Sequence, residues 1–183
     1  SMATVHYTVE SLKPAESIGY LVKRCGVLMS AKAEAAFESQ PLSFVQWIAL
    51  MKLREHGAAM SATELSCEMG HDMGAMTRMV DALEIHGYVR RQRSTRDRRA
   101  VEIELTPHGL AQVQDSMHLM VELLNDLLAP FSQAEVKALI GQLQTMLQRL
   151  QSYEPDLPAL AARASEAAQA RKPRAAARKT GGR

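Results

Sequence analysis

Apolar residues recur every three or four positions along most of the chain, the spacing that buries one face of a helix. Ser, Thr, Asp or Pro precedes these stretches, and Gly or a Gln-Pro pair follows several of them, as is typical of helix starts and ends. Ser61 and Glu64 also have the spacing of a capping box. We therefore predict helices at about 14–39, 43–56, 61–69, 72–85, 107–128 and 132–153.

Between the fourth and fifth predicted helices, the pattern changes from helical spacing to alternation. Val101, Ile103 and Leu105 alternate with polar residues, and the runs 88–93 and 100–105 flank a four-residue turn, as in a β-hairpin. The fold class predicted by this order is mainly α with a small β-wing, that is, a winged helix-turn-helix with further helices before and after it.

The predicted hairpin concentrates positive charge. Residues 88–99 hold six Arg and one Asp, a net charge of +5, whereas the whole chain has a net charge of only +2. A focused field of this kind is typical of a nucleic-acid contact. A hairpin whose charges are simply solvated is the alternative.

The helix at 72–85 fits the DNA major groove, which is about 12 Å wide and admits one helix. A hairpin beside that helix would lie over the sugar-phosphate backbone and the adjacent minor groove, where Arg is favoured. We expect DNA contacts from Met73, Gly74, Thr77, Arg78, Arg93, Arg96, Arg98 and Arg99. Asp97 has the wrong sign for DNA, so we expect it to brace Arg98 or Arg99. The alternative for Arg78 is an internal salt bridge to Asp81 or Glu84.

Three segments of this region resemble the DNA-binding core of the MarR family, the bacterial multiple-antibiotic-resistance-type regulators. They are Thr77-Arg78-x-Val80-Asp81-x-Leu83-Glu84-x-x-Gly87, Asp97-Arg98-Arg99 and Leu105-Thr106-Pro107-x-Gly109. The order of predicted helices fits the family over about 14–153. Gly74 departs from the family pattern, which commonly has Ser or another hydrogen-bonding residue there, and His71 stands where an aliphatic residue is usual.

The resemblance implies an obligate homodimer that represses at a pseudo-palindromic operator and is released by a small, often aromatic and anionic ligand. It assigns dimerisation to the first, fifth and sixth helices. The implied organisation is an N-terminal segment with a dimerisation helix (1–40), a winged lobe (41–105, with the wing at about 88–105), two dimerisation helices (106–153) and a basic tail (154–183).

The same resemblance places the ligand between the dimerisation helices and the winged lobe. We predict a pocket formed by Tyr20, Arg24, Trp47, Met51 and His71, which would supply aromatic walls, a cation and a hydrogen-bond donor. A distant likeness to family members that control nicotinate breakdown suggests an aromatic or N-heteroaromatic carboxylate such as a hydroxynicotinate. Alternatively, Tyr20, Trp47 and Met51 are simply core residues.

The two cysteines, Cys25 and Cys67, lack the spacing of a metal site, and we expect free thiols. Cys25 suggests a second mechanism, an oxidant-sensing repressor, because Lys23 and Arg24 adjoin it; a buried, inert thiol is the simpler interpretation. A dimeric adaptor that does not bind DNA is the other class considered, although it would leave the basic wing unexplained.

No motif for catalysis, a metal or a phosphate-binding loop is present, so we predict no enzyme activity, metal or cofactor. The sequence shows neither a secretory signal nor an apolar run of membrane-spanning length, so we expect a cytoplasmic protein, nucleoid-associated when bound to DNA. Ten of the thirty residues at 154–183 are Ala and seven are Lys or Arg. We expect this tail to be partly disordered and to add nonspecific DNA affinity.

Overall fold

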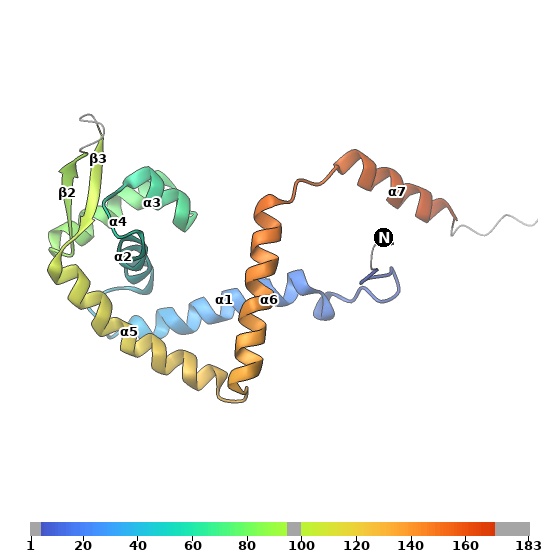
Figure 1. Ribbon diagram of the computed structural model, residues 1–183, viewed down its shortest axis with the longest axis horizontal. Coiled ribbons are helices and arrows are strands. Elements are labelled where there is room, and N and C mark those ends of the chain that lie inside the picture. The colour runs from blue at the N-terminus through green and yellow to red at the C-terminus, as the bar shows by residue number, and fades with distance from the viewer. Residues whose placement is uncertain (1–4, 95–99, 171–183) are drawn as a thin grey trace, which may run out of the picture. The chain divides into compact units, whose positions relative to one another are not determined.

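The computed structural model describes residues 5–94 and 100–170. It is mainly helical with one small antiparallel sheet, which confirms the predicted fold class (Figure 1). In chain order the elements are η1 (Pro14–Glu16), α1 (Ile18–Phe37), α2 (Phe44–His56), β1 (Met60–Ser61), α3 (Ala62–Met69), α4 (Met73–Ile85), β2 (Val89–Arg93), β3 (Val101–Leu105), α5 (Pro107–Leu128), α6 (Gln133–Ser152) and α7 (Leu157–Ala170).

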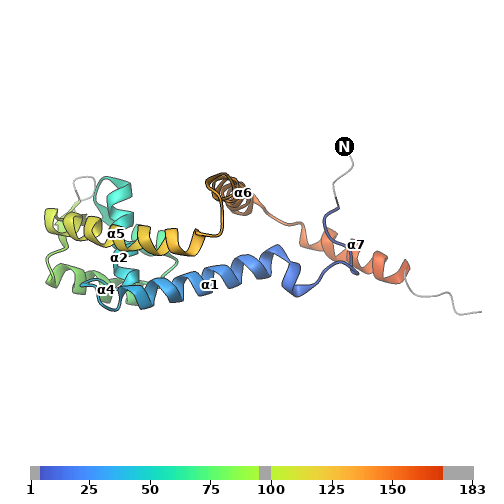
Figure 2. The ribbon, with the colours of Figure 1, turned by 90° about the horizontal axis from the view of Figure 1, so that it is seen from below.

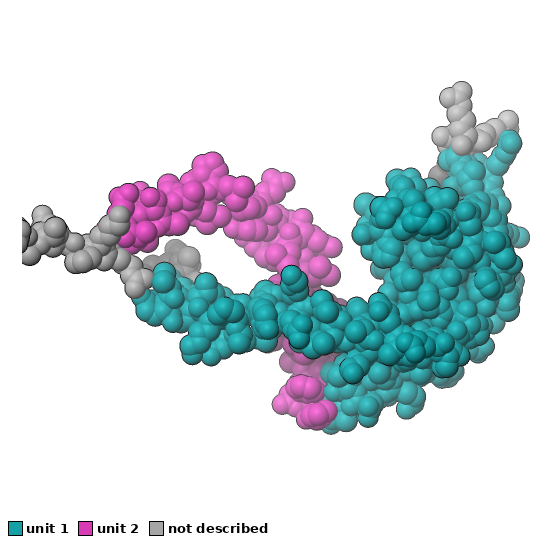
Figure 3. Space-filling view, turned by 180° about the vertical axis from the view of Figure 1, so that it is seen from behind, with its two compact units in different colours: residues 1–129 teal, residues 130–183 magenta. Residues whose placement is uncertain are grey.

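The chain divides into two units, coloured separately in Figure 3. The first, residues 1–129, contains α1 to α5 and the sheet. Within it, α2, α3, α4 and the sheet form a lobe, and α1 extends away from that lobe (Figures 1 and 2). The second unit, residues 130–183, contains α6 and α7.

Side-chain caps define the helix starts, and most of them are the residues that the sequence indicates. Ser43, Ser61 and Ser132 each form a full capping box with the residue three positions later. The first helix differs from the prediction. Pro14 begins only a short 3-10 turn, and α1 starts at Ile18 because Ser17 is extended and its hydroxyl accepts a hydrogen bond from the Tyr20 amide.

The hydrophobic core lies in the lobe. Phe37 at the end of α1 contacts the rings of Phe44 and Trp47 from α2, with centroids 5.6 Å from each. The apolar face of α4 packs into the same core, which excludes water from one side of the helix. The residues of α4 that are buried are Met76, Val80 and Leu83, as the spacing predicts.

The sheet has the strand order β1-β3-β2, with all pairs antiparallel. The hairpin of β2 and β3 is the predicted wing, with Val89 opposite Leu105 and Arg93 opposite Val101. Strand β1 was not predicted. It consists of two residues, of which Met60 pairs with Ile103, and a segment this short has no alternation to detect.

The base of the wing is locked onto the start of α5. The Tyr88 carbonyl accepts hydrogen bonds from the amide and the hydroxyl of Thr106. Gly109, in the first turn of α5, lies so close that an added Cβ would stand 2.0 Å from the Tyr88 oxygen. Only glycine fits here, which accounts for the last residue of the segment Leu105-Thr106-Pro107-x-Gly109.

The described part of the tail is helical. Residues 157–170 form α7, and the Asp156 carboxylate caps it by accepting from the Ala159 amide at 3.0 Å. The helix buries none of its residues, so its order reflects Ala-rich helix propensity and a good cap. The basic residues from Arg171 onward lie outside the described part of the chain.

Candidate nucleic-acid interface

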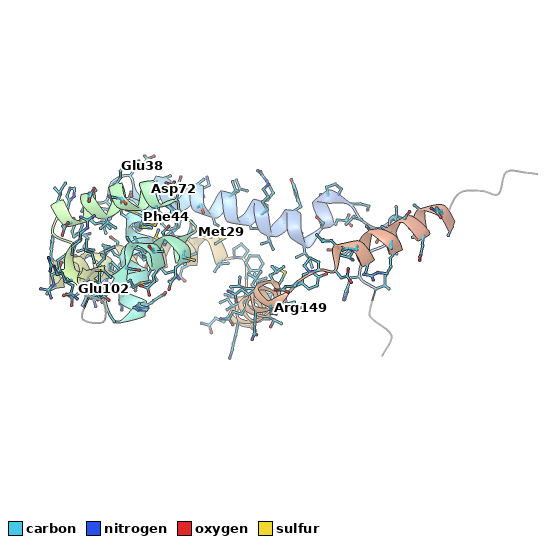
Figure 4. The ribbon with its side chains drawn as sticks, turned by 90° about the horizontal axis from the view of Figure 1, so that it is seen from above. Met29, Glu38, Phe44, Asp72, Glu102 and Arg149 are labelled. Atoms are coloured by element: carbon cyan, nitrogen blue, oxygen red, sulfur yellow. The ribbon has the colours of Figure 1, made fainter. Side chains whose placement is uncertain are left out.

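The turn before α4 fixes where this helix begins. Gly70 is left-handed, with φ of 65°, and the Ser66 hydroxyl donates to the His71 carbonyl. Asp72 then caps α4, its Oδ1 accepting from the Ala75 amide at 2.9 Å. That hydrogen bond holds the pKa of the Asp72 carboxyl below its ordinary value. Asp72 is labelled in Figure 4.

The four residues of α4 for which the sequence predicts DNA contacts lie on its solvent-facing side. Met73, Gly74, Thr77 and Arg78 are all exposed. The Thr77 hydroxyl donates to the Met73 carbonyl at 2.8 Å, so its lone pairs and its methyl group remain for a ligand. Arg78 forms no ion pair within the described ranges 5–94 and 100–170.

Asp81 and Glu84, the alternative partners considered for Arg78, instead bind Arg91 of strand β2. Arg91 Nη2 donates to Asp81 Oδ1 at 2.6 Å, and Nη1 donates to Glu84 Oε2. The Arg91 amide also donates to Glu84 Oε1 at 3.0 Å. These bonds raise the pKa of Arg91, chiefly through Asp81. The polar face of α4 is therefore tied to the wing by one arginine.

The rest of the described hairpin is also partly neutralised. Arg90 Nη2 lies 2.7 Å from Glu104 Oε2 on the facing strand, and the hydroxyl of buried Ser94 donates to Glu102 at 2.6 Å. Arg93, at the end of β2, is exposed and has no ion-pair partner among the described residues. The net charge of +5 counted for 88–99 overstates the field of the hairpin base, since acids from α4 and β3 compensate Arg90 and Arg91.

Four residues of the predicted interface lie outside the described residues. They are Arg96, Asp97, Arg98 and Arg99. The contacts predicted for the three arginines, and the bracing role predicted for Asp97, stay predictions. The brace that the structure does describe is Arg91, which sequence reasoning missed. Its signal was present, because Asp81 and Glu84 are three residues apart and so lie on one face of the helix.

The five residues of the predicted ligand pocket are not brought together within one chain. Tyr20 and Phe37 lie seventeen residues apart on α1, or about 25 Å at the helical rise, whereas Trp47 is in ring contact with Phe37. Trp47 is buried and its indole N–H donates to the Val113 carbonyl, so it serves the core. Met51 and His71 are half-buried; Tyr20 and Arg24 are exposed.

Cys25 is exposed on α1, so the prediction of a buried thiol is wrong for the single chain. Cys67, on α3, is also exposed. Within residues 5–94 and 100–170, no cluster of three or more His, Cys, Asp or Glu is arranged to hold a metal ion. No helix in those ranges has the length and apolar character to cross a membrane.

Comparisons with known proteins agree with this geometry. A model of the MarR family matches residues 42–101. The HTH-type transcriptional regulator PecS of Dickeya dadantii is 31% identical over 141 residues, covering 74% of this chain and 84% of PecS. The transcriptional repressor MprA of Escherichia coli is 28% identical, covering 65% of this chain and 68% of MprA.

Solved structures show the same fold. Wild-type MarR of Escherichia coli superposes with a TM-score of 0.65 at 26% identity, covering 72% of this chain and 97% of MarR. A cysteine-to-serine variant of the same protein, complexed with operator DNA, gives a TM-score of 0.62 at 26% identity, covering 71% and 93%. These relatives are transcriptional regulators and not enzymes. The chain therefore belongs to the MarR family of DNA-binding transcriptional regulators.

Proposed function

We propose that the chain is a homodimeric repressor whose α4 helices enter successive major grooves of a pseudo-palindromic operator while the wings lie over the flanking backbone. The observation that carries this proposal is that the arginines around α4 fall into two groups, those paired with carboxylates and those without an ion pair to a described residue. Arg90 and Arg91 are held by carboxylates, whereas Arg78 and Arg93 are exposed and form no ion pair with a described residue. Arg78 and Arg93 are therefore available to bind phosphates and bases.

The exposed surface of α4 suits base contacts. Thr77 offers a methyl group and hydroxyl lone pairs, Arg78 offers paired donors, and Met73 is 44% exposed and apolar. Methyl groups of thymine and the O6 and N7 atoms of guanine are the matching features of the major groove. Arg93, together with the predicted contacts Arg96, Arg98 and Arg99, would then neutralise phosphates or enter the minor groove.

A second copy of the chain is the partner that the long helices require. In α1, Ile18, Leu21 and Leu28 are each about half exposed, and α6 exposes a stripe of larger extent in its own unit. The exposed apolar residues of α6 are Leu139, Ile140, Leu143, Leu147 and Leu150. Monomeric proteins rarely expose stripes of this size. Dimerisation would also set the separation of the two α4 helices, which must be about 34 Å for successive grooves.

For the effector we propose a small aromatic anion, such as an aromatic or N-heteroaromatic carboxylate. Of the five residues of the predicted pocket, we keep Tyr20 and Arg24 as its binding site. Tyr20 and Arg24 lie four residues apart on α1, hence on one face, and both are exposed. A ring beside a cation suits an aromatic carboxylate. The effector would act by binding one dimer geometry more tightly than the DNA-bound one, which shifts the population away from the operator.

Replacing Arg93 with Ala should weaken operator binding and reduce the slope of log affinity against log salt by about one, because one phosphate contact is lost. The matched control is the charge-neutral double change Arg90→Gln with Glu104→Gln, which removes an internal pair and should leave the slope unchanged. Fluorescence anisotropy of a labelled operator duplex over a salt series measures the affinity and the salt slope of each variant. Equal slopes for wild type and Arg93→Ala would contradict the assignment of the wing.

Replacing Leu143 with Asp should convert the dimer to a monomer, because it places a charge in the buried interface. Operator affinity should fall at least tenfold in the same variant, since a monomer binds only one half-site. Light scattering measures the mass of the protein in solution, and fluorescence anisotropy measures its affinity for the operator. Thr145→Asp, on the opposite face of α6 from the apolar stripe, serves as the control and should remain dimeric. A dimeric Leu143→Asp with unchanged affinity would exclude this interface.

Aromatic acids should raise the melting temperature of the protein and release the operator, whereas their uncharged amides should do neither. At a hundred times the dissociation constant the expected stabilisation is about 2.7 kcal/mol. Salicylate and 6-hydroxynicotinate are suitable probes, each compared with its amide. Arg24→Gln should abolish the shift, while Lys23→Gln, on another face of α1, should preserve it. Equal shifts for acid and amide would refute an anion site at Arg24.

A further inference from the structure

An open hollow lies where the end of α1 meets the start of α2, within the first unit of the chain. Its volume of about 310 Å³ falls at the lower end of the range for small-molecule sites, about 300–1,000 Å³. The residues that line it are Glu34, Phe37, Glu38, Ser43, Phe44 and Val45. None of them belongs to the predicted effector pocket or to the predicted DNA interface.

The apolar wall of the hollow contains aromatic rings. The rings of Phe37 and Phe44 lie 5.6 Å apart between centroids and are tilted by 60°, and Phe44 lies 6.2 Å from the ring of Trp47. Phe37 is buried, whereas Phe44 and Val45 are half-buried. Such a wall suits an aromatic or alkyl group, and the faces of aromatic rings also attract cations.

Two carboxylates stand beside this wall. Glu34 and Glu38 are four residues apart at the end of α1, hence on one face, and both are exposed. Neither forms an ion pair with another residue of the ranges 5–94 and 100–170. Like charges at this spacing repel each other, so a cation bound between them would relieve an unfavourable interaction. Glu38 and Phe44 are labelled in Figure 4.

The helix ends at the hollow do not reverse this charge. The last turn of α1 has no basic residue, and its carbonyl end carries a partial negative charge. The amide end of α2 carries the opposite partial charge, part of which is used by the capping box of Ser43 and Gln46. The two partial charges offset each other, so the full charges of Glu34 and Glu38 dominate.

We propose that this hollow binds a small organic cation, an amine or quaternary ammonium with an aromatic or alkyl body. The body would pack against Phe37 and Phe44, and the positive nitrogen would lie beside Glu34 and Glu38. This ligand is opposite in charge to the effector proposed for Arg24. The inference depends neither on that effector nor on the proposed mode of DNA binding.

The test uses the single tryptophan of the chain as the reporter, because Trp47 is in ring contact with the aromatic wall. Benzyltrimethylammonium is titrated into the full-length protein at constant ionic strength and should change the Trp47 fluorescence in a saturable way. Benzyl alcohol has the same ring without the charge. It should bind about tenfold more weakly, because it cannot form the two ion-pair contacts.

The double variant Glu34→Gln with Glu38→Gln should weaken binding of benzyltrimethylammonium by about tenfold for the same reason. The matched control is Glu154→Gln with Glu166→Gln, which removes the same charge from exposed positions in the second unit and should leave the affinity unchanged. All four side chains are exposed, so the melting temperatures should stay close to that of wild type, which separates loss of binding from unfolding.

Three results would overturn the inference. The first is the absence of a saturable fluorescence change, as expected if a second copy of the chain covers the hollow in the dimer. The second is equal affinity for benzyltrimethylammonium and benzyl alcohol. The third is wild-type affinity for the cation in the Glu34→Gln, Glu38→Gln variant.

Discussion

The position of the wing depends on one arginine of strand β2. Arg91 joins β2 to α4 through Asp81, Glu84 and its own amide, and so holds the hairpin at a set position beside α4. Two elements can match one DNA duplex only if the distance between them is fixed. Charge-assisted bonds to two carboxylates provide this better than a single surface pair, because each restricts the other.

The base of the hairpin is held by close packing and uncharged hydrogen bonds. The Tyr88 carbonyl lies against Gly109 and accepts hydrogen bonds from the amide and the hydroxyl of Thr106, so the base of the wing is fixed to the start of α5. The lobe is thereby connected to the long helix that leads out of it. If α1, α5 and α6 form the dimer as we propose, a ligand at Arg24 would act on the spacing of the two lobes through these contacts.

Most of the fold could be predicted from the sequence because its information is local. Capping residues such as Ser43 and Ser132 lie next to the helices they start, and the spacing of Met76, Val80 and Leu83 fixes the buried face of α4. Strand β1 and the Arg91 brace could not be predicted from the sequence, because both depend on contacts between residues that are distant in the chain and meet only after folding. A charge count over 88–99 overstates the positive charge of the hairpin for the same reason. Glu104 and the acids of α4 lie outside this range in the sequence but pair with Arg90 and Arg91 in the folded chain. The predicted pocket fails in one chain because Tyr20 and Trp47 lie at distant points of the first unit.

The most direct test of this account is the operator affinity of Arg91→Met measured over a salt series. Methionine keeps an unbranched apolar stem and removes every donor of the guanidinium. We predict that affinity falls about tenfold while the slope of log affinity against log salt stays that of wild type, because Arg91 positions the wing and contacts no phosphate. An affinity equal to that of wild type would contradict the account, and so would a slope reduced by about one, which would place Arg91 on the DNA itself.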